Sequence, residues 1–163
     1  MKQSSKINER IFLTENLKPQ IKWWRLINKK IAFTNGVFDI LHEGHIKVLS
    51  QAASFADVLI VGVNSDASVK RLKGNSRPIN NQQSRALILA SLIMIDAVVI
   101  FEEDTPLNLI KKILPDVLIK GGDYTSDTIV GAREVISNGG TIEIIPLEEG
   151  FSTTGIIEKM RKD

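Results

Sequence analysis

Two histidines, His42 and His45, stand three residues apart in the segment His42-Glu43-Gly44-His45, and they are the only histidines in a chain of 163 residues. On a helix, residues three apart lie on one face, so this spacing places the two imidazole rings side by side. An apolar run from Ile31 to Phe38 comes directly before them. The pattern predicts a strand, a tight turn and two hydrogen-bond donors at the start of a helix, where an α/β protein holds a phosphate group.

A zinc site is the other chemistry that a histidine pair suggests. The zinc-protease pattern His-Glu-x-x-His needs two residues between the glutamate and the second histidine, and here only Gly44 stands there. No third ligand of the usual kind follows, and the chain contains no cysteine. We therefore predict no metal held by protein ligands. The absence of cysteine also excludes disulfides and cysteine nucleophiles.

The composition is that of an ordinary soluble chain of one domain, with 43% hydrophobic and 25% charged residues. A net charge of +2, from 21 basic and 19 acidic side chains, argues against a broad surface for nucleic acid. The longest apolar run, Ala86 to Phe101, is interrupted by Ser91 and Asp96 and is too short to span a membrane. The first ten residues do not resemble a signal peptide. We expect a cytoplasmic protein with neither nucleic acid nor membrane as partner.

The elements that must position the histidines alternate along the chain. Short apolar runs without polar alternation predict buried strands over residues 31–37, 57–63, 97–101, 116–120 and 141–146. Helical patterns cover residues 46–55, 81–95, 105–114, 129–138 and 154–162. This order predicts an α/β fold with a doubly wound, five-stranded parallel sheet. Residues 1–30 are interpreted as a helical lead-in with Trp23 and Trp24 as packing residues, and residues 31–163 as the domain itself.

Polar residues follow the predicted strands at the point where each one ends. Because the carboxyl ends of parallel strands meet at one edge of a sheet, these residues are expected to lie together, as ligand-binding residues do in open α/β sheets. The segments concerned are Asn35-Gly36, Asn64-Ser65-Asp66, Lys120 to Tyr124 and Glu148 to Thr154.

Two of these regions resemble the signature motifs of the cytidylyltransferase-like nucleotidyltransferases. The run Asn35 to His45 resembles the first motif, which ends in His-x-Gly-His, and Ser152-Thr153-Thr154 resembles the second, Ile-Ser-Thr-Thr. The resemblance spans about Ile31 to Met160. The lead-in Leu147-Glu148-Glu149-Gly150 lacks the arginine of glycerol- and choline-phosphate cytidylyltransferases. Further segments favour the heptose 1-phosphate adenylyltransferase branch: residues 64–66, 71–74, 76–78, 101–106 and 118–124.

The resemblance implies a Rossmann-like His-x-Gly-His nucleotidyltransferase fold and a reaction. The expected enzyme joins ATP and D-glycero-beta-D-manno-heptose 1-phosphate to give ADP-heptose and pyrophosphate, by in-line attack on the α-phosphate. The alternative is a cytidylyltransferase for a polyol or amino-alcohol phosphate such as glycerol 3-phosphate. A non-catalytic module that keeps the fold and senses ATP is the alternative of another class. The resemblance also implies Mg²⁺ on the phosphate oxygens and a homodimer. Because no kinase-like domain precedes this one, we expect the sugar phosphate to come from a separate sugar kinase upstream.

The resemblance further implies roles for residues at the predicted edge. The catalytic residues are His42, His45 and Lys73, with Lys73 in a mobile loop over residues 70–77 that closes on the phosphates. Asp39 and Asp66 either hold the sugar phosphate or orient the histidines, and the sequence does not separate these roles. The Ser-Thr-Thr segment can bind phosphate, but it can equally be a helix N-cap. The nucleotide-binding residues are Asn35, Gly36, Val37, Phe38, Gly44, Arg85, Lys120, Gly122, Asp123, Ser152, Thr153 and Thr154.

Overall fold

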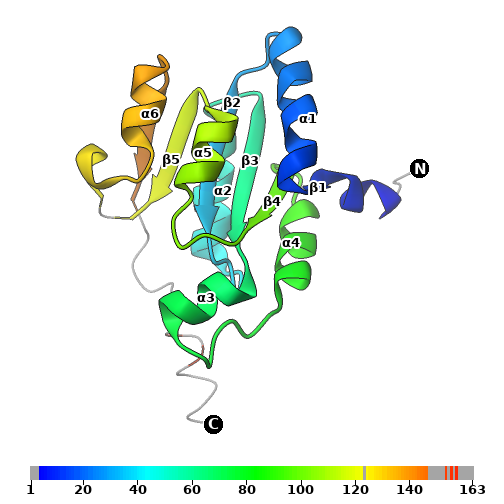
Figure 1. Cartoon of the computed structure of the whole chain (residues 1–163). Coiled ribbons are helices and arrows are strands. Elements are labelled where there is room, and N and C mark those ends of the chain that lie inside the picture. The colour runs from blue at the N-terminus through cyan, green and yellow to red at the C-terminus, as the bar shows by residue number, and fades with distance from the viewer. Residues whose placement is uncertain (1–3, 123, 147–152, 154, 156, 158–163) are drawn as a thin grey trace.

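A parallel sheet of six strands forms the centre of the computed structural model, with the strand order β1-β4-β3-β2-β5-β6 (Figure 1). The structure describes residues 4–122, 124–146, 153, 155 and 157. The strands are β1 (Ile11–Phe12), β2 (Ile31–Gly36), β3 (Val58–Asn64), β4 (Ala97–Phe101), β5 (Val117–Gly121) and β6 (Thr141–Ile145). The prediction of an α/β parallel sheet is confirmed, and the prediction of five strands is wrong.

The sixth strand is β1, which lies at the edge of the sheet and pairs in parallel with β4, Ile11 opposite Val98 and Phe12 opposite Val99. It has two residues, too few to show any periodicity, so hydrophobic patterning could not identify it. The five predicted strands are all present.

The helices cover both faces of the sheet. Helices α1 (Thr14–Leu26), α5 (Leu107–Ile113) and α6 (Ala132–Ser137) lie on one face, and α2 (Glu43–Ala53) and α4 (Gln82–Ala90) on the other (Figure 1). Short 3-10 helices span Ser4–Arg10 and Ser126–Thr128. In α1, Trp24 is buried and Trp23 is 53% exposed, so only one of the two tryptophans packs in the core. None of the helices in the described ranges has the length and apolar character that crossing a membrane requires.

Helix α3 (Asp66–Lys73) was not predicted, and it occupies the first part of the segment expected to be a loop over residues 70–77. Its sequence, DASVKRLK, is strongly polar, and Val69 is its one fully buried apolar residue. A single apolar contact gives no helical periodicity to detect. What starts the helix is the Ser65 hydroxyl, which accepts a hydrogen bond from the Ser68 amide at 3.2 Å.

Aspartates at the amino ends of the strands fix their register. The carboxylate of Asp116, just before β5, accepts a hydrogen bond from the Ile31 amide of β2 at 2.7 Å. Asp96, just before β4, does the same with the Leu59 amide of β3 at 2.9 Å. These bonds hold neighbouring strands level, so the opposite, carboxyl ends of β2, β3 and β5 also come together.

Candidate active site

The chain turns sharply between β2 and α2 at Phe38, whose φ of +49° lies in the left-handed region. The Phe38 ring folds back over Gly36, where a Cβ atom would come within 3.0 Å of the ring. The same ring lies 5.3 Å, centroid to centroid, from the imidazole of His45. Gly36 therefore leaves the space that lets Phe38 support the histidine.

His42 and His45 meet at the amino end of α2, as their spacing predicts. His42 is the N-cap residue and makes no side-chain capping bond, and His45 lies in the first turn. The ring centroids are 3.9 Å apart with the planes tilted by 33°. The Nδ1 atom of His45 is buried and has no hydrogen-bond partner among the described residues. The two imidazoles therefore lie at the amino end of α2, where the helix dipole is positive.

The surroundings of both histidines favour the neutral imidazole. Burial lowers the pKa of His42, and burial together with the neighbouring His42 lowers the pKa of His45 to about 4. A neutral imidazole carries one N–H donor. An incoming anion would favour the protonated form, so a bound phosphate raises both pKa values again.

Asp39 is almost fully buried, and protein donors surround its carboxylate. It accepts hydrogen bonds from Arg77 Nε at 2.6 Å, Ile79 N at 2.8 Å and Asn80 N at 2.9 Å. Burial acts to raise the pKa of Asp39, and the bonds from Asn80, Ile79 and Arg77 outweigh it, so the pKa is lowered overall. In this structure Asp39 fastens the chain before α4 to the turn before α2.

Arg85 of α4 is 1% exposed and reaches through the core to the carboxyl edge of the sheet. Its guanidinium donates to Asn80 O at 2.9 Å, Val37 O at 2.6 Å and Asp66 Oδ1 at 2.7 Å. Two of the expected ligand-binding residues, Arg85 and Asp66, therefore bind each other here. Contact of either one with a substrate stays a prediction.

Lys120 and Asn35 form a second polar pair, at the ends of the neighbouring strands β5 and β2. Lys120 Nζ donates to Asn35 Oδ1 at 2.7 Å. Burial lowers the pKa of Lys120 to about 8. Gly122, with φ of +130°, follows directly, and its amide donates to Ile145 O at 3.0 Å. The strand ends thus bring together Asn35, Lys120 and Gly122, as expected from their positions.

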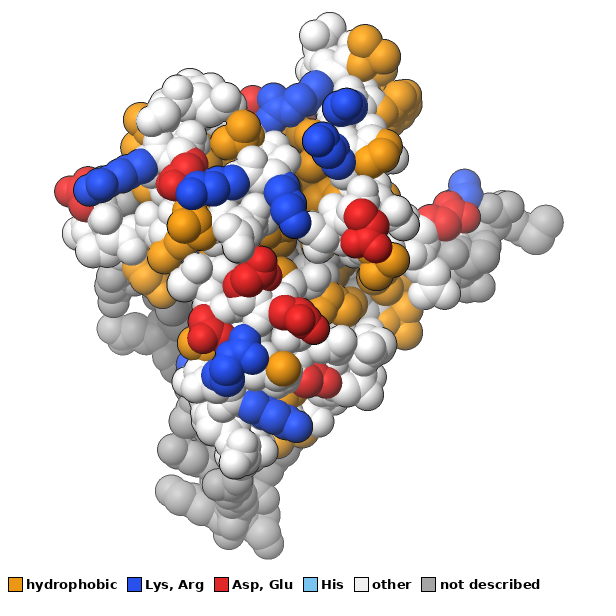
Figure 2. All heavy atoms as spheres, viewed as in Figure 1, with side chains coloured by type: hydrophobic (Ala, Val, Ile, Leu, Met, Phe, Trp, Pro, Cys, Tyr) orange, Lys and Arg blue, Asp and Glu red, His pale blue; other side chains and the backbone are white. Residues whose placement is uncertain are grey.

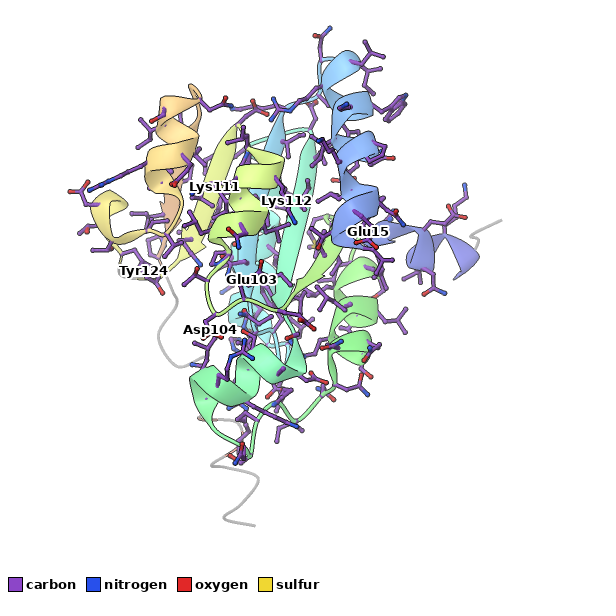
Figure 3. All side chains as sticks on the ribbon, in the orientation of Figure 1. Glu15, Glu103, Asp104, Lys111, Lys112 and Tyr124 are labelled. Carbon is purple, nitrogen blue, oxygen red and sulfur yellow. The ribbon has the colours of Figure 1, made fainter. Side chains whose placement is uncertain are left out.

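Lys73 is the last residue of α3, is exposed, and forms no ion pair with a described residue. The helix that carries it is tied to the segment after β4, because Arg71 binds the Asp104 carboxylate at 2.7 Å and the Glu102 carbonyl at 2.6 Å. Figure 3 shows Asp104 and Glu103 beside α3. Closure of Lys73 over a phosphate stays a prediction.

The second motif touches the first at one described residue. Thr153 Oγ1 donates to the Ile40 carbonyl, two residues before His42, at 3.4 Å. Thr153, Gly155 and Ile157 have helical backbone conformation. The expected site residues Asp123, Ser152 and Thr154 lie outside the described residues. One contact therefore joins two motifs separated by more than one hundred residues.

Sequence reasoning assigned no role to Arg77 or Asn80, which bind Asp39 directly. They lie 38 and 41 residues from their partner, so no spacing rule connects them. Nor do the described residues contain a group of three or more His, Asp or Glu side chains able to hold a metal ion.

A cavity of about 620 Å³ lies away from this edge, between α1 and α5. Its lining includes Glu15, Lys18, Lys111 and Lys112 over the apolar Leu17 and Ile21. Figure 2 shows basic side chains gathered over this part of the face and acidic ones below them. None of the lining residues is a histidine, so the cavity is separate from the paired imidazoles.

The sequence is similar to several known proteins. The model of the cytidylyltransferase-like family matches residues 33–159. The chain is 57% identical to Bifunctional protein HldE of Hyphomonas neptunium over 140 residues, which cover 86% of this chain and 29% of that protein. It is 50% identical to Bifunctional protein HldE of Rhodospirillum rubrum over 94% of this chain and 31% of that protein. The chain thus spans less than a third of the length of these curated relatives.

A solved structure is also similar, that of the lipopolysaccharide core biosynthesis protein from Thermoplasma volcanium. The TM-score is 0.58 at 26% sequence identity, and the match covers 74% of this chain and 97% of the other.

Proposed function

Since the chain belongs to the cytidylyltransferase-like family, we propose that it is a nucleotidyltransferase that makes ADP-heptose and pyrophosphate from ATP and D-glycero-beta-D-manno-heptose 1-phosphate. The observation that carries the proposal is the pair His42 and His45, neutral and in ring contact at the amino end of α2. A helix start with imidazole donors suits the phosphates of a nucleotide. The heptose 1-phosphate adenylyltransferase branch is supported by the similar solved structure, which is that of a lipopolysaccharide core biosynthesis protein.

The reaction needs positioning and charge stabilisation more than covalent chemistry from the protein. An oxygen of the sugar phosphate attacks the α-phosphorus of ATP and forms a new P–O bond. The bond from the α-phosphorus to the bridging oxygen breaks, and pyrophosphate leaves with that electron pair. Negative charge grows on the leaving group, so N–H donors aimed at it lower the barrier.

The residues divide this work by position. His42 and His45 donate to oxygens of the α-phosphate and of the leaving pyrophosphate. The amides of the first turn of α2, including Gly44, face the same phosphates. Thr153 would bind the β- and γ-phosphates, a role supported by the bond from its hydroxyl to the Ile40 carbonyl beside the turn.

Mg²⁺ enters with ATP as part of the substrate. Magnesium keeps several waters and is commonly held by phosphate oxygens with one or two carboxylates. At this edge the carboxylates of Asp39 and Asp66 are hydrogen-bonded to Arg77 and Arg85, which fits a metal held mainly by the triphosphate.

A matrix of nucleotides and acceptors tests the function. The protein is incubated with ATP or CTP and with heptose 1-phosphate, glycerol 3-phosphate or choline phosphate, and released pyrophosphate is measured. We expect release with ATP and heptose 1-phosphate. Release with CTP and glycerol 3-phosphate alone would refute the proposal in favour of a cytidylyltransferase. ATP binding without pyrophosphate release from any pair would indicate a sensing module.

The homodimer, the separate sugar kinase and the cytoplasmic location stay predictions. Sedimentation velocity tests the first of them.

A further inference from the structure

Lys120 is a cation at the carboxyl edge whose charge is not balanced by any carboxylate of the described residues. Its one hydrogen bond to them goes to the neutral amide oxygen of Asn35. Among the described residues, Arg77 and Arg85 are also buried or half-buried cations at this edge, and they have counter-charges, because Arg77 binds Asp39 and Arg85 binds Asp66. A half-buried ammonium without an anion among the described residues is costly, and the pKa of Lys120, lowered by burial to about 8, reflects that cost.

Lys120 and the histidines lie on opposite sides of the sheet. Side chains alternate along a strand, so Asn35 shares a face with Phe33, and Lys120 shares a face with Leu118. Phe33 and Leu118 belong to the core under α1, α5 and α6. Phe38 and α2 belong to the core on the other face. Two donor groups therefore approach the edge of β2 from its two sides.

In-line displacement requires this kind of arrangement, because the attacking oxygen and the leaving oxygen stand on opposite sides of the phosphorus. If the amino end of α2 and its histidines hold the leaving pyrophosphate, the acceptor arrives from the side of Asn35 and Lys120. We propose that Lys120, held in place by Asn35, binds the phosphate group of the acceptor sugar phosphate. This inference rests on the proposed function, and it differs from the nucleotide-binding role that the family resemblance implies for Lys120.

The charges of the reacting groups also support a phosphate-binding role for Lys120. The acceptor phosphate is an anion that must approach the anionic triphosphate, and a cation on the side of the acceptor offsets part of their repulsion. The ammonium of Lys120 has three N–H donors. One is used by Asn35, so two are left for phosphate oxygens. The bound acceptor would supply the counter-charge that no described residue provides.

Steady-state kinetics of Lys120→Met test the assignment, with Lys112→Met as the matched control. Lys112 is exposed on α5, and no ion pair to a described residue holds it. We expect Lys120→Met to raise the KM for the sugar phosphate about 10- to 100-fold, the usual effect of losing a charged hydrogen bond. The Kd for ATP, measured by calorimetry, should change less than about twofold. A large change in the Kd for ATP with an unchanged KM for the sugar phosphate would overturn the assignment.

Asn35→Asp provides a test in which stability should improve while binding of the sugar phosphate weakens. The new carboxylate would lie beside the Lys120 ammonium and form the missing ion pair. We expect the melting temperature to rise, because the buried charge is then balanced, and the KM for the sugar phosphate to rise as well, because the carboxylate repels the phosphate. A rise in stability with an unchanged KM would show that the pair has only a structural role and would refute the proposal.

Inorganic phosphate separates this proposal from the proposed function. Phosphate that binds the folded state raises the melting temperature with concentration. We expect a larger rise for wild type and Lys112→Met than for Lys120→Met, whereas general salt effects are equal in all three. If wild type shows this difference but makes no ADP-heptose, the function fails and the anion site stands. If it turns over and Lys120→Met gives wild-type kinetics and wild-type phosphate response, the anion site fails alone.

Discussion

The imidazole rings of His42 and His45 are in contact, with their centroids 3.9 Å apart. At this distance a proton on one ring disfavours a proton on the other, and His42 contributes to the lowered pKa of His45. The pair therefore accepts its positive charge most readily when an anion is bound beside it. This behaviour is useful in a site that binds a triphosphate and then releases pyrophosphate.

Removal of His45 is expected to impair turnover far more than folding. His45→Ala should lower kcat by about 10²- to 10³-fold, the usual effect of losing one preorganised donor to a transition state. The melting temperature should stay close to that of wild type, since the Nδ1 atom of His45 satisfies no hydrogen bond in the core. Pyrophosphate release and thermal unfolding measure the two quantities. Unchanged kcat would remove His45 from the mechanism.

Stability should depend on pH through His45. Its pKa is about 4 in the folded state against 6.5 for an unperturbed histidine, so between these values the unfolded chain binds more protons. The free energy of unfolding therefore falls as pH falls from 6.5 towards 4. Urea unfolding of wild type and His45→Asn across this range measures the effect. We expect a smaller loss in the variant, and equal losses would contradict the assigned pKa.

Gly36→Ala should disturb the histidine pair from a distance. The added Cβ would lie 3.0 Å from the Phe38 ring, which must move, and that ring contacts His45. We expect a stability loss of about 1–3 kcal/mol, typical of overpacking, together with a lower kcat. Phe38→Leu in the Gly36→Ala background supplies the control, since the smaller side chain makes room for the methyl group and should restore part of the stability. No recovery in the double variant would contradict the steric explanation.

The ion pair of Arg85 and Asp66 should be strongly coupled. Arg85→Met leaves the Asp66 carboxylate and two carbonyl groups without their donor, at an expected cost of about 3–5 kcal/mol for breaking a buried pair. Asp66 is partly exposed, so Asp66→Asn should cost less. A double-mutant cycle on the free energy of unfolding measures the coupling. The Kd of ATP for Arg85→Lys then tests nucleotide contact, and additive stabilities would show that the pair is unimportant.

The central strands could be predicted because each is a compact apolar run buried on both faces, as Val58–Asn64 in β3 illustrates. The two-residue β1 and the polar α3 could not, because their formation depends on tertiary partners: Val98 and Val99 for β1, and Arg71 with Asp104 for α3.

The site divides in the same way. Spacing alone placed His42 and His45 together, and strand-end position placed Asn35 beside Lys120. The sequence did not reveal that Asp39 and Arg85 form ion pairs with other residues of the protein, Arg77 and Asp66. Such long-range ion pairs leave no local pattern, since the partners are 38 and 19 residues apart.

The Arg85 guanidinium donates hydrogen bonds to three oxygens, and two of them are main-chain carbonyl oxygens, those of Val37 and Asn80. Every amino acid type supplies such an oxygen, so the identity of the side chain at those two positions is irrelevant to the bond. Only Arg85 and Asp66 contribute side chains to it. Substitution at positions 37 and 80 can therefore change the side chains at this edge of the sheet while both bonds from Arg85 keep their form.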